Sequence, residues 1–211
     1  MPTATIGFVR PLEPEDRVRA DLYALFARLF FGPPDAGLLR TMGSAPLIAE
    51  EADTSPLAIA WARLAAASRV MDPDAASDEY EALFGGVGKS LISPYASYHA
   101  SANTPGAAGQ YLVDLRQDLI KRGIALQEGQ SIPEDHCAAL FETMRLLIAG
   151  NDEIAPSPIE EQRAFFARFI APFYAICCNA ISQSSVANFY RIVAECSSAF
   201  LAIEDESLAI A

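Results

Sequence analysis

Prolines and glycines divide this chain into segments that have the apolar spacing of α-helices. Pro14, Ser55-Pro56 and Pro133 each open such a segment, and acidic residues directly follow Pro14 and Pro133. A proline at the first position of a helix loses no hydrogen bond, and acids beside it interact favourably with the helix dipole. Apolar residues then recur every three or four positions, as in residues 18–29, until glycine or proline interrupts the pattern.

The same features predict helices along most of the chain. The expected ranges are 14–31, 36–41, 56–70, 75–84, 109–122, 133–148, 159–181 and 186–203. Alternation of apolar and polar residues is nearly absent, so no segment requires a strand. We therefore predict an all-α fold of about eight to ten helices. For 211 residues the simplest expectation is a single-domain multi-helix bundle, residues 1–211, with a long central loop or hinge at 85–108.

Charge and hydropathy indicate the kind of partner. The net charge is −12, from 27 acidic residues against 15 Lys and Arg. Nucleic-acid binding depends on basic groups that neutralise phosphates, so we expect no nucleic acid and a basic partner instead. The N-terminus lacks the pattern of a secretory signal, and the longest apolar run, residues 170–181, is too short to span a bilayer. We expect a soluble cytoplasmic protein with no membrane span.

The cysteines predict no metal centre. Cys137, Cys177, Cys178 and Cys196 lack the spacing of metal ligands, and the chain offers only two histidines beside them. Two adjacent cysteines on a helix point in different directions, which prevents them from chelating one ion together. We expect buried, reduced thiols.

The segment GGVGKS, residues 85–90, has the look of a phosphate-binding loop. A P-loop requires a glycine at the position that Leu83 occupies, and a variant loop requires a lysine where the chain has Phe84. A P-loop also lies after a buried strand and opens a helix, whereas the residues before this segment have helical spacing and Pro94 would interrupt a helix after it. Nucleotide binding through a P-loop-like segment is therefore the alternative function.

Three short motifs occur one after another along the chain. They are Tyr-x-x-Leu-Phe at residues 80–84, Pro-Tyr-Ala-Ser-Tyr-His at 94–99 and Pro-Glu-Asp-His at 133–136. Together with the all-α pattern, they resemble the TorD/DmsD family of redox-enzyme maturation chaperones. The chain departs from the family pattern in three places: Ile132 stands where a glutamate is usual, His99 where an aromatic is common, and residues 169–173 where a His-Leu and Trp pair is usual. Residues 114–125 are similar to the branch of the family associated with formate dehydrogenase.

The resemblance implies a non-catalytic binder. Such a chaperone holds the twin-arginine signal peptide of a molybdoenzyme precursor, here formate dehydrogenase, and delays export until the cofactor is inserted. The implied partners are that peptide and the apo-form of the catalytic subunit, with the chaperone as a monomer or homodimer. No cofactor is expected, although the resemblance leaves open a weak guanine-nucleotide affinity. The implied peptide-binding residues are Tyr80, Leu83, Phe84, Pro94, Tyr95, His99, Glu134, Asp135 and His136.

Several of these residues also have a purely structural interpretation. Leu83 and Phe84 are equally suited to a core, and Glu134 and Asp135 to the first turn of a helix after Pro133. Alternatively, the carboxylates pair with the two arginines of the peptide, for which bidentate contacts provide energy and direction. Asp135 beside His136 also suggests acid–base chemistry, but no nucleophile motif accompanies them, so we do not expect an enzyme.

Overall fold

The computed structural model describes residues 12–46, 54–85, 90–100, 106–124 and 132–210, and it confirms the predicted all-α class. The helices in chain order are α1 (Pro14–Phe31), α2 (Ala36–Ser44), α3 (Pro56–Val70), α4 (Pro73–Phe84), α5 (Ala96–Ala100), α6 (Ala107–Lys121), α7 (Cys137–Ala149), α8 (Ile159–Phe165), the π-helical turn η1 (Phe166–Ile170), α9 (Ala171–Gln183) and α10 (Phe189–Ile210). Within the described ranges, extended pairing is limited to an isolated bridge between Tyr95 and His136. The expectation of one domain over residues 1–211 stays a prediction.

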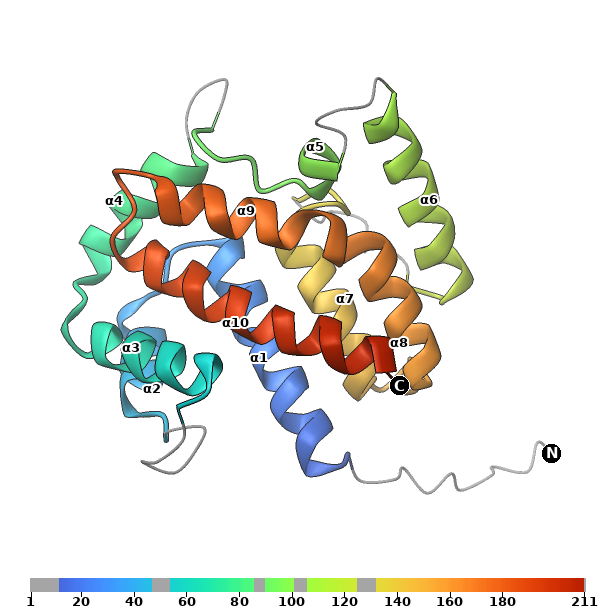
Figure 1. Ribbon diagram of the computed structural model, residues 1–211, viewed down its shortest axis with the longest axis horizontal. Helices are drawn as coiled ribbons and strands as arrows, with labels where there is room; N and C mark the ends of the chain where they lie inside the picture. The colour runs from blue at the N-terminus through green and yellow to red at the C-terminus, as the bar shows by residue number, and fades with distance from the viewer. Residues whose placement is uncertain (1–11, 47–53, 86–89, 101–105, 125–131, 211) are drawn as a thin grey trace.

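Two helix pairs form the centre of the bundle. α9 and α10 form a hairpin in front, α1 and α7 pack together behind it, and α6 lies at one edge against α5 (Figure 1). Aromatic side chains from these helices meet in one core. The Tyr23 ring lies 6.2 Å from that of Phe141 and 4.9 Å from that of Phe200, so α1, α7 and α10 are joined directly.

Local capping explains the starts of α3 and α4. The Ser55 hydroxyl accepts a hydrogen bond from the Ala58 amide at 3.3 Å, with Pro56 at the first helical position, as the sequence predicts. α4 begins two residues earlier than predicted. The Asp72 carboxylate accepts from the amides of Asp74 and Ala75, both at 3.0 Å, and Pro73 therefore becomes the first helical residue.

The prediction that residues 134–136 form the first turn of a helix is wrong. α7 begins at Cys137, and the His136 side chain caps it by accepting from the Ala138 amide at 3.2 Å. The backbone before the helix bonds to another part of the chain. The Cys137 amide donates to the Pro94 carbonyl at 2.9 Å, and the Asp135 carbonyl accepts from Ala96 at 2.8 Å. These tertiary bonds hold residues 134–136 in a turn outside the helix.

The predicted helix 159–181 is continuous in space but not regular. At Pro172 no backbone N–H is available, and the preceding turn widens into η1, in which the Ala171 amide bonds to the Phe166 carbonyl. The resulting helix, residues 159–183, is long and apolar enough by composition to cross a membrane. Phe165, Phe169 and Phe173 are nonetheless buried in the protein core, which accounts for the apolar composition.

The predicted long loop after α4 contains the short helix α5. The first part of this loop is anchored to the end of α4, because the Ile92 amide donates a hydrogen bond to the Leu83 carbonyl at 2.9 Å. Residues 86–89, with Lys89 of the nucleotide-binding alternative, and residues 101–105 lie outside the described residues. On either side of 86–89 the structure has helix α4 and a non-helical stretch that begins at Ser90. The strand before and the helix after that a P-loop requires are therefore missing from the described flanks.

Candidate functional site

The second and third motifs lie side by side. Their backbones are joined by the Tyr95–His136 bridge and by the two hydrogen bonds that flank it. The Tyr95 ring meets the His136 ring edge to face, with centroids 5.5 Å apart. We call these two paired segments, residues 93–99 and 132–137, the bridged turn. It brings together six of the nine predicted site residues, namely Pro94, Tyr95, His99, Glu134, Asp135 and His136.

Asp135 holds the bridged turn from inside. Its side chain accepts a hydrogen bond from the Ser97 hydroxyl at 2.5 Å, and the residue is 4% exposed. His136 is buried as well, and burial lowers its pKa while the neighbouring Asp135 carboxylate raises it. A neutral ring fits its capping role, because the Nδ1 atom must remain an acceptor for the Ala138 amide.

Glu134 carries the ion pair of the bridged turn. Arg116 of α6 donates from Nε to Oε1 of Glu134 at 2.7 Å and from Nη2 to Oε2 at 3.4 Å. This hydrogen bonding lowers the pKa of Glu134, and burial opposes the shift. Residues 134 and 116 are 18 positions apart, and no local sequence spacing links them. The sequence therefore predicted the carboxylate but not its partner.

The exposed part of the bridged turn is aromatic. Tyr95 is 37% exposed and Tyr98 is 54% exposed, whereas His99 is buried and its Nε2 lies 2.7 Å from the Ser93 carbonyl. Leu91, just before the bridged turn, is also exposed. Apolar side chains thus reach the surface in the same turn as a carboxylate that already holds a guanidinium.

The first motif lies mainly in the core. Leu83 is completely buried, and Phe84 packs against Tyr80 and Tyr190, with ring centroids 5.1 Å and 5.5 Å away. The Tyr80 hydroxyl donates to the carbonyls of Phe30 and Phe31 at the end of α1, and burial raises its pKa to about 12. The observed contacts of this motif are therefore those of core residues, as its structural interpretation states.

Glu79, one residue before that motif, has a role that the sequence did not suggest. Its carboxylate accepts from the amides of Asn188, Phe189 and Tyr190 at 2.7, 3.0 and 2.7 Å. These are the free amides at the N-terminus of α10, which would otherwise lack a partner in the helix. The nearest of them is 109 residues away in the chain, beyond any local capping signal.

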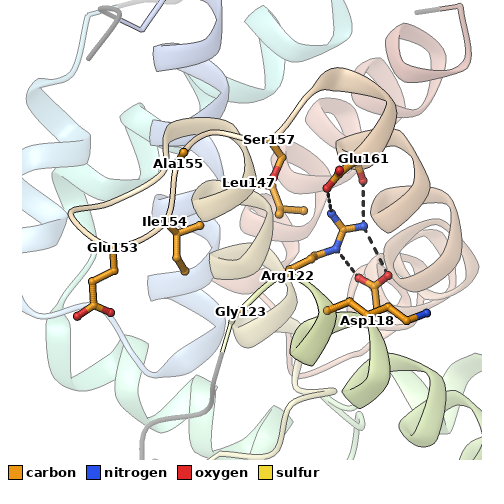
Figure 2. Close-up of a pocket in the computed structure, with 10 residues that line it drawn as sticks. Asp118, Arg122, Gly123, Leu147, Glu153, Ile154, Ala155, Ser157 and Glu161 are labelled. Atoms are coloured by element: carbon orange, nitrogen blue, oxygen red, sulfur yellow. Dashed lines mark hydrogen bonds and ion pairs between the residues drawn. The ribbon is translucent and has the colours of Figure 1, made fainter. Parts of the chain in front are cut away.

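A pocket of about 510 Å³ lies elsewhere, between the end of α6, the loop before α8 and α8 itself (Figure 2). None of the nine predicted residues lines it. Arg122 lies in its wall, 2.5 Å from the Asp118 carboxylate and 2.8 Å from that of Glu161, and its guanidinium carbon is 5.8 Å from the centre of the Phe165 ring. These contacts join the end of α6 to α8, so the position of Arg122 in the pocket wall is explained by a structural role.

The cysteines are buried thiols in the structure. Burial raises the pKa of Cys178 and of Cys196 to about 12, so both stay protonated at neutral pH. Across the described part of the chain, no group of three or more histidine, cysteine or acidic residues is arranged to hold a metal ion.

The Asp135–Ser97 hydrogen bond is expected to stabilise the bridged turn measurably. A double-mutant cycle with Asp135→Ala and Ser97→Ala should give a coupling energy of about 1.5 kcal/mol, the lower range for a hydrogen bond to a charged group. Urea unfolding of the four proteins measures it. Asp135→Asn is the matched variant: it keeps an oxygen acceptor and should lose less stability than Asp135→Ala. Additive single effects would contradict this role for the hydrogen bond.

Comparison with known proteins identifies a family. A family model described as nitrate reductase delta subunit matches residues 50–179, which include all three motifs. No curated protein matches the chain.

Proposed function

Because this chain belongs to the nitrate reductase delta subunit family, a TorD-like family of redox-enzyme maturation chaperones, we propose that it binds the twin-arginine signal peptide of a molybdoenzyme precursor. The proposed client is the apo-form of a catalytic subunit, with formate dehydrogenase as the specific enzyme. Members of the family act with molybdoenzyme subunits, and they are soluble cytoplasmic proteins. For this chain we propose the same location, a binding role without catalysis and no cofactor.

The bridged turn is the observation that carries the proposal. It presents Tyr95 and Tyr98 at the surface, in the same turn as Glu134, whose carboxylate pairs with a guanidinium. A twin-arginine signal peptide combines arginines with an apolar stretch. The exposed rings provide apolar contact area, and a carboxylate favours bidentate pairing with arginine.

The other predicted residues act on this surface indirectly in the proposal. Asp135, His136 and His99 are buried and hold the bridged turn in shape. Leu83 and Phe84 support it from below through the Leu83–Ile92 backbone hydrogen bond and the core. A peptide contact by the side chains of Asp135, His136 or His99 would require the bridged turn to open, because all three are buried.

Calorimetry with twin-arginine peptides from the same organism tests the proposal. We expect specific binding that weakens when both peptide arginines are changed to lysine, because lysine lacks the planar fork of arginine. The net charge of −12 should also make binding weaker at higher salt. No binding to any such peptide would contradict the proposed function.

A protein variant locates the binding surface. Tyr95→Ala is expected to weaken peptide binding about tenfold, equivalent to the roughly 1.4 kcal/mol that burial of part of a tyrosine ring provides. Val70→Ala is the control, because Val70 is an apolar residue that is 85% exposed at the end of α3. Equal effects of the two substitutions would place the peptide outside the bridged turn.

A further inference from the structure

The ion pair between Arg116 and Glu134 is unequal in its exposure. The Glu134 side chain is 9% exposed, whereas the Arg116 side chain is 61% exposed. A buried carboxylate without a partner is unfavourable, since it has lost its contacts with water. An exposed arginine regains water at little cost when it leaves its partner. Glu134 therefore depends on a cationic partner, while Arg116 does not depend on Glu134.

Three other ion pairs in the described residues do not combine an exposed arginine with a buried carboxylate. Arg122 and Arg19 are themselves mostly buried, with side chains 11% and 18% exposed, so neither is easily displaced. Arg168 is 53% exposed, but its partner Asp114 is 26% exposed and also accepts a hydrogen bond from Gln110. Asp114 therefore has water and Gln110 available when Arg168 leaves.

We propose that Glu134 is an exchangeable guanidinium-binding site, which Arg116 fills in the free protein and an arginine of the bound peptide fills in the complex. The second half of this statement rests on the proposed function, and the first half does not. Arg116 is then an internal competitor, and its exposed side chain marks the direction from which a ligand arginine reaches the carboxylate. An arginine that arrives there joins the turn that carries the exposed tyrosine rings.

If Glu134 is an exchangeable guanidinium-binding site, a small guanidinium compound should rescue a variant that lacks Arg116. Arg116→Ala should lower the melting temperature by about 3 °C, since Glu134 loses its partner. Ethylguanidinium should restore most of that loss, and ethylammonium at the same ionic strength should not, because it lacks the planar fork. The backbone amide of residue 134 should shift in the NMR spectrum during the ethylguanidinium titration. Equal effects of the two cations, or no shift at that amide, would overturn the proposal.

Two further variants keep the test decisive. Arg168→Ala is the matched control, because Asp114 keeps Gln110 and water, and we expect no preference for ethylguanidinium in this variant. Arg116→Gln removes the positive charge next to Glu134 but keeps most of the aliphatic stem, and it covers the case in which Arg116→Ala does not fold. The same preference for ethylguanidinium is expected in it, and its absence there overturns the proposal as well.

The peptide distinguishes this inference from the proposed function. If the peptide arginine replaces Arg116, Arg116→Ala should bind the twin-arginine peptide at least about threefold more tightly than the natural chain, since the competitor is gone. Unchanged or weaker binding would overturn the exchange. If the peptide binds neither protein while ethylguanidinium rescues Arg116→Ala, the proposed function fails and the guanidinium site stands.

Discussion

Glu204→Ala is expected to lower the free energy of unfolding by about 3 kcal/mol, because it breaks a buried ion pair between the first and last helices. The Arg19 guanidinium of α1 donates to both Glu204 oxygens, at 2.7 and 2.9 Å, and the Tyr23 hydroxyl donates to one of them at 3.1 Å. Glu204 is 2% exposed. Its loss leaves Arg19 with Asp16 and some solvent, so we expect the lower end of the range for broken buried pairs.

Urea unfolding measures this effect. Glu206→Ala is the matched control, because Glu206 is an exposed acid on the same helix and should change stability by less than about 0.5 kcal/mol. If the two substitutions have equal effects, the pair contributes no more than an ordinary surface charge.

Glu79→Ala should destabilise the protein by roughly 2–3 kcal/mol, since three amides at the start of α10 lose their acceptor together. The amides of Phe189 and Tyr190 are partly buried, and water cannot fully replace the carboxylate there. The substitution should also speed hydrogen exchange in the first turn of α10 more than in α9.

Asp78→Asn provides the comparison for Glu79. Asp78 is the neighbouring acid on α4, and it is exposed. We expect this variant to show little change in stability or in the hydrogen exchange of α10. Uniform acceleration of exchange across all helices in Glu79→Ala would indicate a global loss of stability without a local role as a cap.

The sequence predicted those features of the fold that depend on neighbouring residues. Ser55 and Pro56 define the start of α3, because the cap and its amide are three residues apart. The start of α7 was predicted wrongly, because hydrogen bonds to Pro94 and Ala96 outweigh the local preference for a helix after Pro133. The Glu79 cap could not be predicted from local sequence either, since the amides that it accepts from lie more than 100 residues away in the chain.

The distinction between local and long-range contacts also applies to the candidate site. Of the three motifs, the structure joins the second and third around Tyr95 and His136, and it places Leu83 of the first in the core. Which side chains reach the surface depends on packing, and no spacing rule separates the buried Asp135 from the exposed Tyr98. Arg116 was missed for a related reason: a partner on another helix becomes visible only once the helices are placed.

The π-helical turn η1 has a consequence for the rotational phase of the helix that contains it. The core residues Phe165, Phe169, Phe173, Cys177 and Ile181 occur at intervals of four. A regular α-helix turns about 100° per residue, so this stripe would drift by about 160° around the helix axis. The wider turn accommodates one extra residue and cancels about 100° of that drift. One continuous helix can therefore keep a single face toward the core along its whole length.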